Sequence, residues 1–172
     1  MRLNLGSGKK RMEGYINCDI SEKSNPDLIV DIEKELPFEE DSIDEIFMDN
    51  VLEHTKNRLK VLDNLYKVCK NGAIIKIIVP YFAHVNSVAC LDHYGRFGYR
   101  TFDTLDKSKE KSNWWGEETN FKIIKKELRF SKRAKIIPFL FNKSNKFKQL
   151  YEDYLANIFP ARQLEVWLEV RK

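Results

Sequence analysis

Residues 2–8, RLNLGSG, and residues 15–20, YINCDI, decide the expected fold. Each stretch starts with the apolar residues of a short strand and ends in residues typical of a turn. Gly6 and Gly8 end the first stretch, and Asp19 ends the second. The chain therefore opens with two short strands, each followed at once by a turn.

Further strand-like runs follow. They lie at 28–30, 45–48, 73–79, 121–130 and 163–170. Apolar residues at helical spacing predict a helix over 59–69 with its stop at Asn71-Gly72, and a second helix over 147–158 ended by Pro160. Short strands that alternate with helices or compact connections predict a mostly parallel sheet, in which ligands bind beyond the carboxyl ends of the strands.

The composition is that of an ordinary globular chain. Its 172 residues are 42% hydrophobic and 33% charged, and they show no repeat or linker, so we expect one domain over 1–172. No apolar run approaches the roughly 20 residues of a bilayer span, and there is no signal segment, which predicts a cytoplasmic protein. The scattered Cys18, Cys69 and Cys90 indicate buried thiols in a reducing compartment, without disulfides or structural zinc.

Charge is unevenly distributed. Residues 1–56 hold 7 Lys and Arg against 14 Asp and Glu, whereas residues 107–148 hold 13 against 4. A basic segment of this kind is compatible with a phosphate-bearing or nucleic-acid partner. The lysines are spread out and form no recognisable RNA-binding motif, which favours a solvated surface instead.

Three consecutive strand ends carry groups suited to a ligand. The first has the glycine turn, the second has Asp19, and the third has Asp31-Ile32. A carboxylate at the end of the second strand is where nucleotide-binding folds accept hydrogen bonds from ribose hydroxyls. Three such ends in order indicate a nucleotide-like ligand more strongly than any one of them alone.

The ordered set LNLGSG, GYINCDI, DIEKELPFEEDSID, MDNVLEHT and KVCKNGAIIKIIVP resembles class I S-adenosylmethionine-dependent methyltransferases over residues 1–80. The resemblance implies a Rossmann-like, doubly wound, mostly parallel α/β sheet with a C-terminal antiparallel strand pair in a three-layer α/β/α arrangement. Residues 1–80 would be its cofactor-binding half, and 81–172 its acceptor side and closing strands. The implied cofactor is S-adenosyl-L-methionine, bound by Asn4, Gly6, Ser7, Gly8, Asp19, Ile20, Asp31, Ile32 and Asn50. The connection from Gly8 to the second strand is too short for the helix that family members carry there.

Residues 81–115 contain eight aromatic residues in 35, against 12% in the whole chain, and we expect them to form a mobile cover with an acceptor pocket. His84 and His93 follow the fifth strand, and Asp92-His93 resembles an acid and histidine of related enzymes. An imidazole titrates near neutral pH, so His93 and His84 are the candidate catalytic bases. His54, Tyr81 and Tyr94 are the candidate substrate-binding residues. No His, Asp and Glu set has metal-ligand spacing along the chain, so no metal site is expected.

Three functions remain open from the sequence. The first is methyl transfer to a small-molecule acceptor, and the second is a non-catalytic module or partner subunit that binds the same cofactor. The third is a nucleotide-binding dehydrogenase, although the glycine turn lacks the third glycine of the dinucleotide fingerprint.

Overall fold

The computed structural model describes residues 1–108, 120–131 and 137–172. Trp114 and Trp115, two of the eight aromatic residues predicted to form a cover over 81–115, lie outside these ranges. Seven strands and three α-helices have these bounds: β1 Arg2–Leu5, β2 Ile16–Asp19, β3 Leu28–Ile29, β4 Ile43–Asp49, α1 Arg58–Val68, β5 Cys69–Pro80, β6 Phe121–Arg129, α2 Ile137–Phe141, α3 Asn145–Tyr154 and β7 Gln163–Val170.

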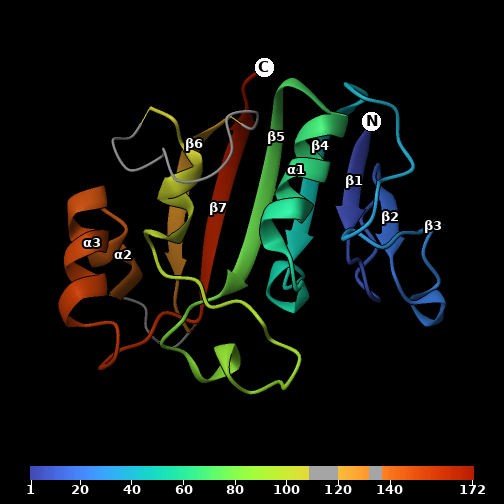
Figure 1. Cartoon of the computed structure of the whole chain (residues 1–172). Coiled ribbons are helices and arrows are strands. Elements are labelled where there is room, and N and C mark those ends of the chain that lie inside the picture. The colour runs from blue at the N-terminus through green and yellow to red at the C-terminus, as the bar shows by residue number, and fades with distance from the viewer. Residues whose placement is uncertain (109–119, 132–136) are drawn as a thin grey trace.

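The strands form one seven-stranded sheet in the order β3-β2-β1-β4-β5-β7-β6 (Figure 1). All neighbouring pairs from β3 to β5 are parallel, whereas β7 is antiparallel to both β5 and β6. The expected Rossmann-like, mostly parallel sheet with antiparallel strands from the C-terminal part of the chain is confirmed. Strand order reverses between β1 and β4, which is where a sheet of this kind opens a ligand crevice at its carboxyl edge.

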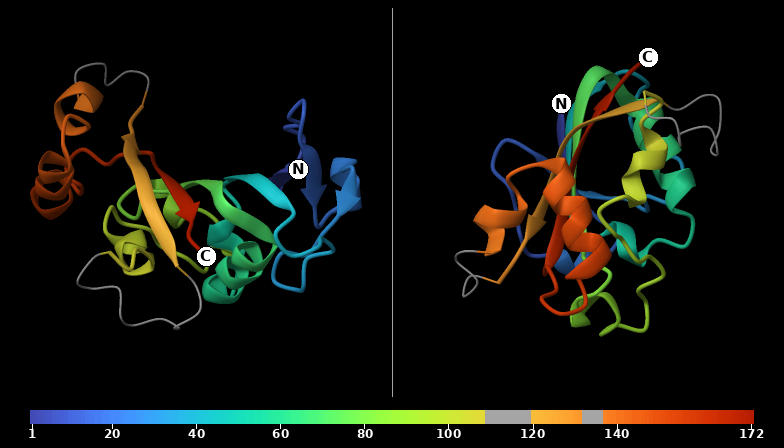
Figure 2. Two further views of the ribbon diagram at one scale, coloured as in Figure 1. Left: turned by 90° about the horizontal axis from the view of Figure 1, so that it is seen from above. Right: turned by 90° about the vertical axis from the view of Figure 1, so that its left-hand side faces the viewer.

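The main core lies between the sheet and α1. Ile46 and Met48 of β4, Ile75 and Ile77 of β5 and Val166 of β7 are fully buried. α1 adds Val61 and Leu65, while the Asn57 side chain caps its first turn by accepting from the Lys60 N–H at 3.1 Å. Figure 2 shows α1 on one face of the sheet and no described helix over the centre of the other.

The helix predicted over 59–69 ends one residue early, at Val68, whereas the predicted end of the second helix at 158 was wrong. α1 ends at Val68 and not at Asn71-Gly72, because Cys69 already has extended backbone (φ −76°, ψ 141°) and pairs with Ile43 of β4. α3 ends at Tyr154, well before Pro160. In both places the helix ends before the glycine or proline that was expected to terminate it, because the following strand or turn begins earlier.

α2 and α3 lie beyond the β6 edge of the sheet (Figures 1 and 2). Between them Asn142 closes that edge: its Oδ1 accepts from the Leu128 N–H at 3.0 Å, and its Nδ2 donates to the Leu128 carbonyl at 2.8 Å. The N–H and the carbonyl of Leu128 in this edge strand are thus both hydrogen-bonded by one side chain.

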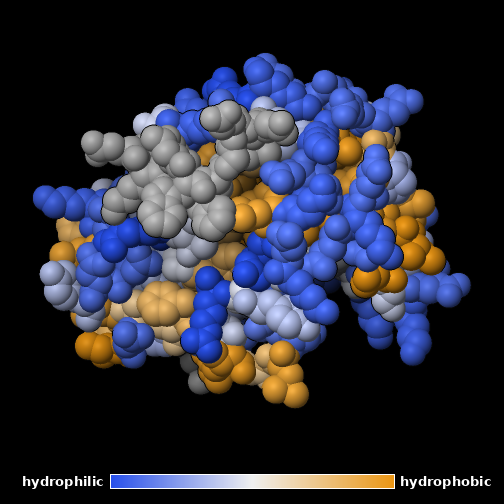
Figure 3. Space-filling model, viewed as in Figure 1, coloured by the Kyte–Doolittle hydropathy of each residue, from blue (hydrophilic) through white to orange (hydrophobic). Residues whose placement is uncertain are grey.

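Four aromatics of the segment after β5 belong to the core and not to an open cover. Tyr81, Phe97, Tyr99 and Phe102 are each at most 3% exposed. The apolar side chains that this segment does expose are different ones, namely Val85, Val88, Leu91 and Tyr94. Figure 3 shows apolar surface at the lower end of the molecule, where this loop lies, while the surface around α1 is largely hydrophilic. Across residues 1–108, 120–131 and 137–172, none of the helices has the length and apolar content to cross a bilayer.

Candidate cofactor site and adjoining histidine cluster

A cavity of about 430 Å³ lies where β1, β2 and β4 end. This volume falls within the range of small-molecule sites. Its lining comes from strand ends far apart in sequence: Gly6, Asp19, Ile20, Val30, Asp31, Ile32, Glu33, Asn50, Val51, His54, Thr55 and Asp92. Seven of these residues were predicted to bind cofactor or substrate, and the parallel sheet brings them together.

The turn after β1 requires glycine at Gly6. Its φ of +63° is in the left-handed region, and a Cβ added there would lie 2.3 Å from Cγ2 of Val51. Gly8 also has a positive φ, +50°, but a Cβ there would meet no described atom within 4 Å. Gly6 is therefore required both by its backbone conformation and by the lack of space for a Cβ, whereas Gly8 is required by conformation alone. At Gly6 the backbone itself lines the cavity.

Asp19 organises the turns around the cavity. Its Oδ2 accepts from the Gly8 N–H at 2.7 Å, and its Oδ1 accepts from the Ser21 N–H at 2.8 Å. A carboxylate has about four lone-pair sites, so two acceptor positions remain for a ligand. Asp19 thus combines a structural role with the capacity to bind hydroxyl groups.

The backbone after β3 is fixed from two sides. Asp31 Oδ1 accepts from the Glu33 N–H at 3.1 Å, and Asn64 of α1 donates from Nδ2 to the carbonyls of Ile32 at 3.3 Å and Lys34 at 2.7 Å. The buried Asn64 was not predicted, because it lies within an otherwise apolar helix face. It holds Ile32 at the cavity wall.

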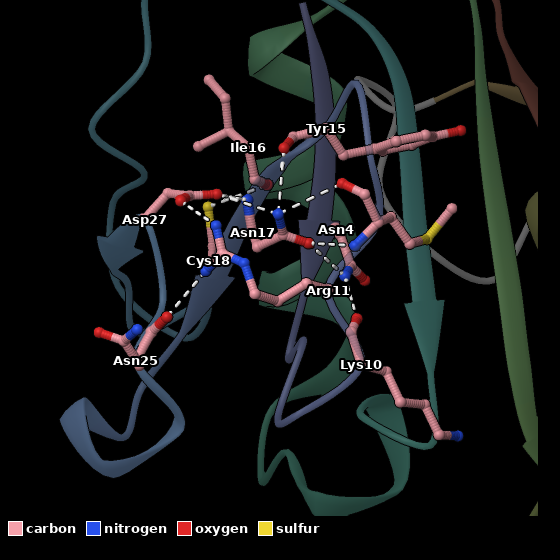
Figure 4. Close-up of polar contacts among 10 residues, drawn as sticks. Asn4, Lys10, Arg11, Tyr15, Ile16, Asn17, Cys18, Asn25 and Asp27 are labelled. Atoms are coloured by element: carbon pink, nitrogen blue, oxygen red, sulfur yellow. Dashed lines mark hydrogen bonds and ion pairs between the residues drawn. The ribbon is translucent and has the colours of Figure 1, made fainter.

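A pair of buried asparagines replaces the helix that usually links the first two strands. Asn4 Nδ2 donates to Asn17 Oδ1 and to the Lys10 carbonyl, both at 2.9 Å, and Asn17 Oδ1 also accepts from the Met12 N–H at 2.7 Å. Figure 4 shows these side chains meeting between the strands, with Asp27 on the far side of Asn17. Asn4 therefore supports the connection behind the cavity and does not line it.

Asn50 turns the chain out of β4 into the cavity. It has a left-handed φ of +56°, and its backbone N–H donates to the Ile78 carbonyl at 2.8 Å. Its side-chain Oδ1 accepts from Gln163 Nε2 at 3.2 Å. Asparagine tolerates this backbone conformation better than most residues, which explains its place at the bend.

The cavity has an acidic lining. Asp19, Asp31, Glu33 and Asp92 contribute carboxylates, and no Lys or Arg occurs among the described lining residues. Such a site attracts cationic ligands and repels phosphate groups.

Next to the cavity lies a cluster that we call the histidine cluster, made of Glu53, His54, Asp92 and His93. His54 Nδ1 lies 2.9 Å from Asp92 Oδ2, and the His54 and His93 rings pack edge to face with centroids 4.6 Å apart. Glu53 is 1% exposed. Burial raises the pKa of Glu53 to about 7, and the carboxylates of Asp49 and Asp92 add to the rise.

Besides Asn4, Gly8 and His93, four predicted residues do not line the cavity. Ser7 is buried, and its hydroxyl has no hydrogen-bond partner among the described residues, whereas His84 Nδ1 accepts from the Asn86 N–H at 3.1 Å. Tyr81 is fully buried, and Tyr94 is 52% exposed beside Lys56. Of the lining residues, sequence reasoning missed Val30, Glu33, Val51 and Thr55, whose only signal was their position next to a strand end.

Comparisons with known proteins agree with this arrangement. Residues 9–77 match the family model described as a methyltransferase domain. No curated protein gives a significant match to the sequence.

Solved structures show the same fold over almost the whole chain. A chain of the complex between the Haloferax volcanii Trm112 methyltransferase activator and a methyltransferase has 13% identity and a TM-score of 0.62, covering 99% of this chain and 82% of that one. An S-adenosylmethionine-dependent methyltransferase from Archaeoglobus fulgidus has 14% identity and a TM-score of 0.59, covering 98% and 85%. The plantazolicin methyltransferase BpumL, solved with S-adenosylhomocysteine, has 17% identity and a TM-score of 0.58, covering 99% and 76%.

At these identities the likeness to solved structures concerns the fold, and the family model adds the sequence of residues 9–77. The strand order with one antiparallel strand near its end, and a cavity at the carboxyl edge of β1, β2 and β4, fit both comparisons. The chain thus has the fold of S-adenosylmethionine-dependent methyltransferases, and its residues 9–77 match the sequence of a methyltransferase domain.

Proposed function

We propose that the protein transfers a methyl group from S-adenosylmethionine to a small-molecule acceptor. The observation that carries the proposal is the acidic cavity at the carboxyl edge of the sheet, with four carboxylates and no cationic side chain among its described lining residues. S-adenosylmethionine carries a positively charged sulfonium, so an acidic lining favours it over a phosphate-bearing cofactor.

The residues present fit this cofactor. Gly6 offers a cradle that a Cβ would fill, and Asp19 has acceptor positions left for the two ribose hydroxyls. Asp31 and the backbone of Ile32 are placed to contact the adenine, as the family resemblance implies. When bound, the cofactor supplies an electrophilic methyl group on a good leaving group. The protein's own contribution is alignment, with a proton acceptor where the acceptor atom carries a proton.

The acceptor side lies at the histidine cluster. His54 and Asp92 line the cavity, and the ring of His93 packs against that of His54. Both burial and the nearby Arg162 lower the pKa of His84, the other candidate base, and His84 is not among the lining residues. We therefore assign proton transfer to His93 in preference to His84, with Tyr94 beside it on the exposed side.

The dehydrogenase alternative is disfavoured by the turn after β1. A dinucleotide places its pyrophosphate at a helix N-terminus that follows the glycine turn. In residues 6–15, all of which are described, the chain forms no helix and is instead held by Asn4 and Asn17.

A cofactor-binding partner subunit is the second candidate. It is favoured by the Haloferax volcanii neighbour, whose structure is a complex with an activator protein, and by the shortened connection between β1 and β2. A module of this kind would bind the cofactor and show turnover only with its partner.

Calorimetric titration with S-adenosylmethionine, S-adenosylhomocysteine and NAD tests the proposal. We expect the first two to bind and to raise the melting temperature, because a ligand of the folded state alone stabilises it. Binding of NAD alone, or no heat with any of the three at millimolar concentration, would refute the cofactor assignment. Binding without turnover on a panel of small acceptors would favour the partner-subunit alternative.

A further inference from the structure

Buried polar atoms without partners concentrate in the histidine cluster. Among the described residues, four buried side-chain polar atoms lack a hydrogen-bond partner, and three of them belong to Glu53 and His93. They are both carboxylate oxygens of Glu53 and Nδ1 of His93. A buried polar group without a partner destabilises the fold, and native structures contain few of them, so three in one place indicate a missing ligand.

Three residues of the cluster bring possible ligand atoms close together. One ligating atom each from Glu53, His54 and His93 lies within 4.8 Å of the other two. In a filled tetrahedral site with bonds of about 2.0–2.2 Å, neighbouring ligand atoms are about 3.3–3.6 Å apart. Small rotations about the side-chain bonds close that difference.

The backbone holds the two halves of the cluster together. The Glu53 carbonyl accepts from the Tyr94 N–H at 2.8 Å and from the Gly95 N–H at 3.1 Å. These bonds fasten the residues that follow His93 to the 3₁₀ helix Leu52–His54. The three side chains are therefore positioned before any ligand arrives.

Asp92 supplies the outer support that metal-binding histidines usually have. Its Oδ2 lies 2.9 Å from His54 Nδ1, which leaves Nε2 of that ring for a ligand. A carboxylate on the far nitrogen fixes the tautomer and orientation of a ligating imidazole and increases its basicity.

We infer that Glu53, His54 and His93 form a binding site for a divalent transition-metal ion such as Zn²⁺, with Asp92 as the positioning residue for His54. Two imidazoles and one carboxylate are the donor set of several catalytic zinc sites, whereas Mg²⁺ and Ca²⁺ prefer oxygen ligands alone.

This site could not be predicted from the spacing of residues along the chain. Glu53 and His54 are adjacent, but His93 lies in a different loop, so no ligand motif is visible in the sequence. The inference concerns ion binding and does not depend on methyl transfer. Ion binding by His93 and the proton transfer assigned to it above are alternative roles, because an imidazole nitrogen that binds an ion accepts no proton from a substrate.

The test uses the full-length protein, stripped with a chelator and titrated with Zn²⁺ in competition with a chromophoric chelator, and with Co²⁺ as a spectroscopic probe. We expect one equivalent of Zn²⁺ and the visible absorption of four- or five-coordinate Co²⁺. Glu53→Gln and His93→Ala should weaken Zn²⁺ binding at least a hundred-fold, and Asp92→Asn about 10–100-fold.

His84→Ala is the matched control, because it removes a histidine of the same segment whose Nδ1 is already bonded. It should bind Zn²⁺ as the unchanged protein does. Cys90→Ser tests the neighbouring set of Cys90, Asp92 and His93, which also has three ligating atoms within 4.8 Å of one another. Loss of binding in Cys90→Ser with retention in Glu53→Gln would overturn the assignment, as would a lack of stoichiometric binding by the unchanged protein.

Folding is checked separately. Glu53→Gln is isosteric and removes an unpaired buried carboxylate, so the metal-free variant should melt no lower than the metal-free parent. S-adenosylhomocysteine affinity, measured on the same samples, separates the two proposals. Zn²⁺ binding without S-adenosylhomocysteine binding would refute the proposed function alone, and the reverse would refute the metal site alone.

Discussion

Replacing Gly6 by alanine, with Gly8→Ala as its partner experiment, measures how much the close approach at the cavity contributes to stability. Both glycines have left-handed φ values, +63° at Gly6 and +50° at Gly8. Each substitution therefore carries the conformational cost of roughly 1–2 kcal/mol for a side chain in that region. Of the two positions, only Gly6 would bring the new Cβ against other described atoms, at 2.3 Å and 2.9 Å from the two Cγ atoms of Val51.

The contact at Gly6 adds an overpacking cost of about 1–3 kcal/mol. For a chain of this length 1 kcal/mol corresponds to about 2–4 °C in melting temperature, so Gly6→Ala should melt about 2–12 °C below Gly8→Ala. Urea denaturation of the ligand-free protein gives the free-energy difference directly.

Val51→Ala supplies the control, since it removes both offending Cγ atoms and leaves Cβ at 3.2 Å. In that background, Gly6→Ala should cost little more than Gly8→Ala does. Equal stability of the two single variants, or an unchanged cost of Gly6→Ala in the Val51→Ala background, would refute the steric argument.

Four further predictions follow from the geometry. Asp19→Ala should weaken S-adenosylhomocysteine binding by about 1.5–3 kcal/mol in calorimetry, and it should also lower the melting temperature, because two backbone N–H groups lose their acceptor. Asn17→Ala should cost about 2–4 kcal/mol in urea denaturation, through several buried groups left unpaired, and an effect below about 1 kcal/mol would show that water replaces the amide. The Arg11 guanidinium and the hydrogen bonds from Asn17 lower the pKa of Asp27 to about 2. The contribution of Asp27 to stability is therefore complete above its unfolded pKa near 4 and is lost as the pH falls through 2. Asp27→Asn should make the free energy of unfolding depend less on pH between about 4 and 2. His93→Ala should lower turnover about a hundred-fold or more with nearly unchanged S-adenosylhomocysteine affinity, and a parallel loss of melting temperature and affinity would instead indicate a structural histidine.

The strand ends that line the cavity were predictable because their signal is local. Gly6, Asp19 and Asp31 each follow an apolar run directly, and a parallel sheet necessarily gathers such positions at one edge. The β7 strand, Gln163–Val170, was likewise predicted to the residue from its composition.

The remaining features depend on contacts that no periodicity encodes. Asn4 and Asn17 form a buried pair only because β1 and β2 are adjacent, and a strand pattern with a polar residue on the inner side gives no hint of its partner. The same holds for Glu53 and His93, which come from separate loops. Tyr81 was expected at an acceptor pocket, but its fully buried ring packs with Tyr151 of α3, a helix whose position the sequence does not reveal.

The two hydrogen bonds from the Asn142 side chain to the Leu128 backbone affect the tendency of the protein to aggregate. An open strand edge is a template on which another chain adds by backbone pairing, the first step toward aggregates. At β6 these hydrogen bonds already occupy one N–H and one carbonyl, and Lys122, Lys125 and Arg129 place charged side chains along the same strand. At the opposite edge β3 is only two residues long. Both edge strands are therefore poor templates for backbone pairing with another chain. We expect the sheet to stop at seven strands even where many copies of the chain are close together.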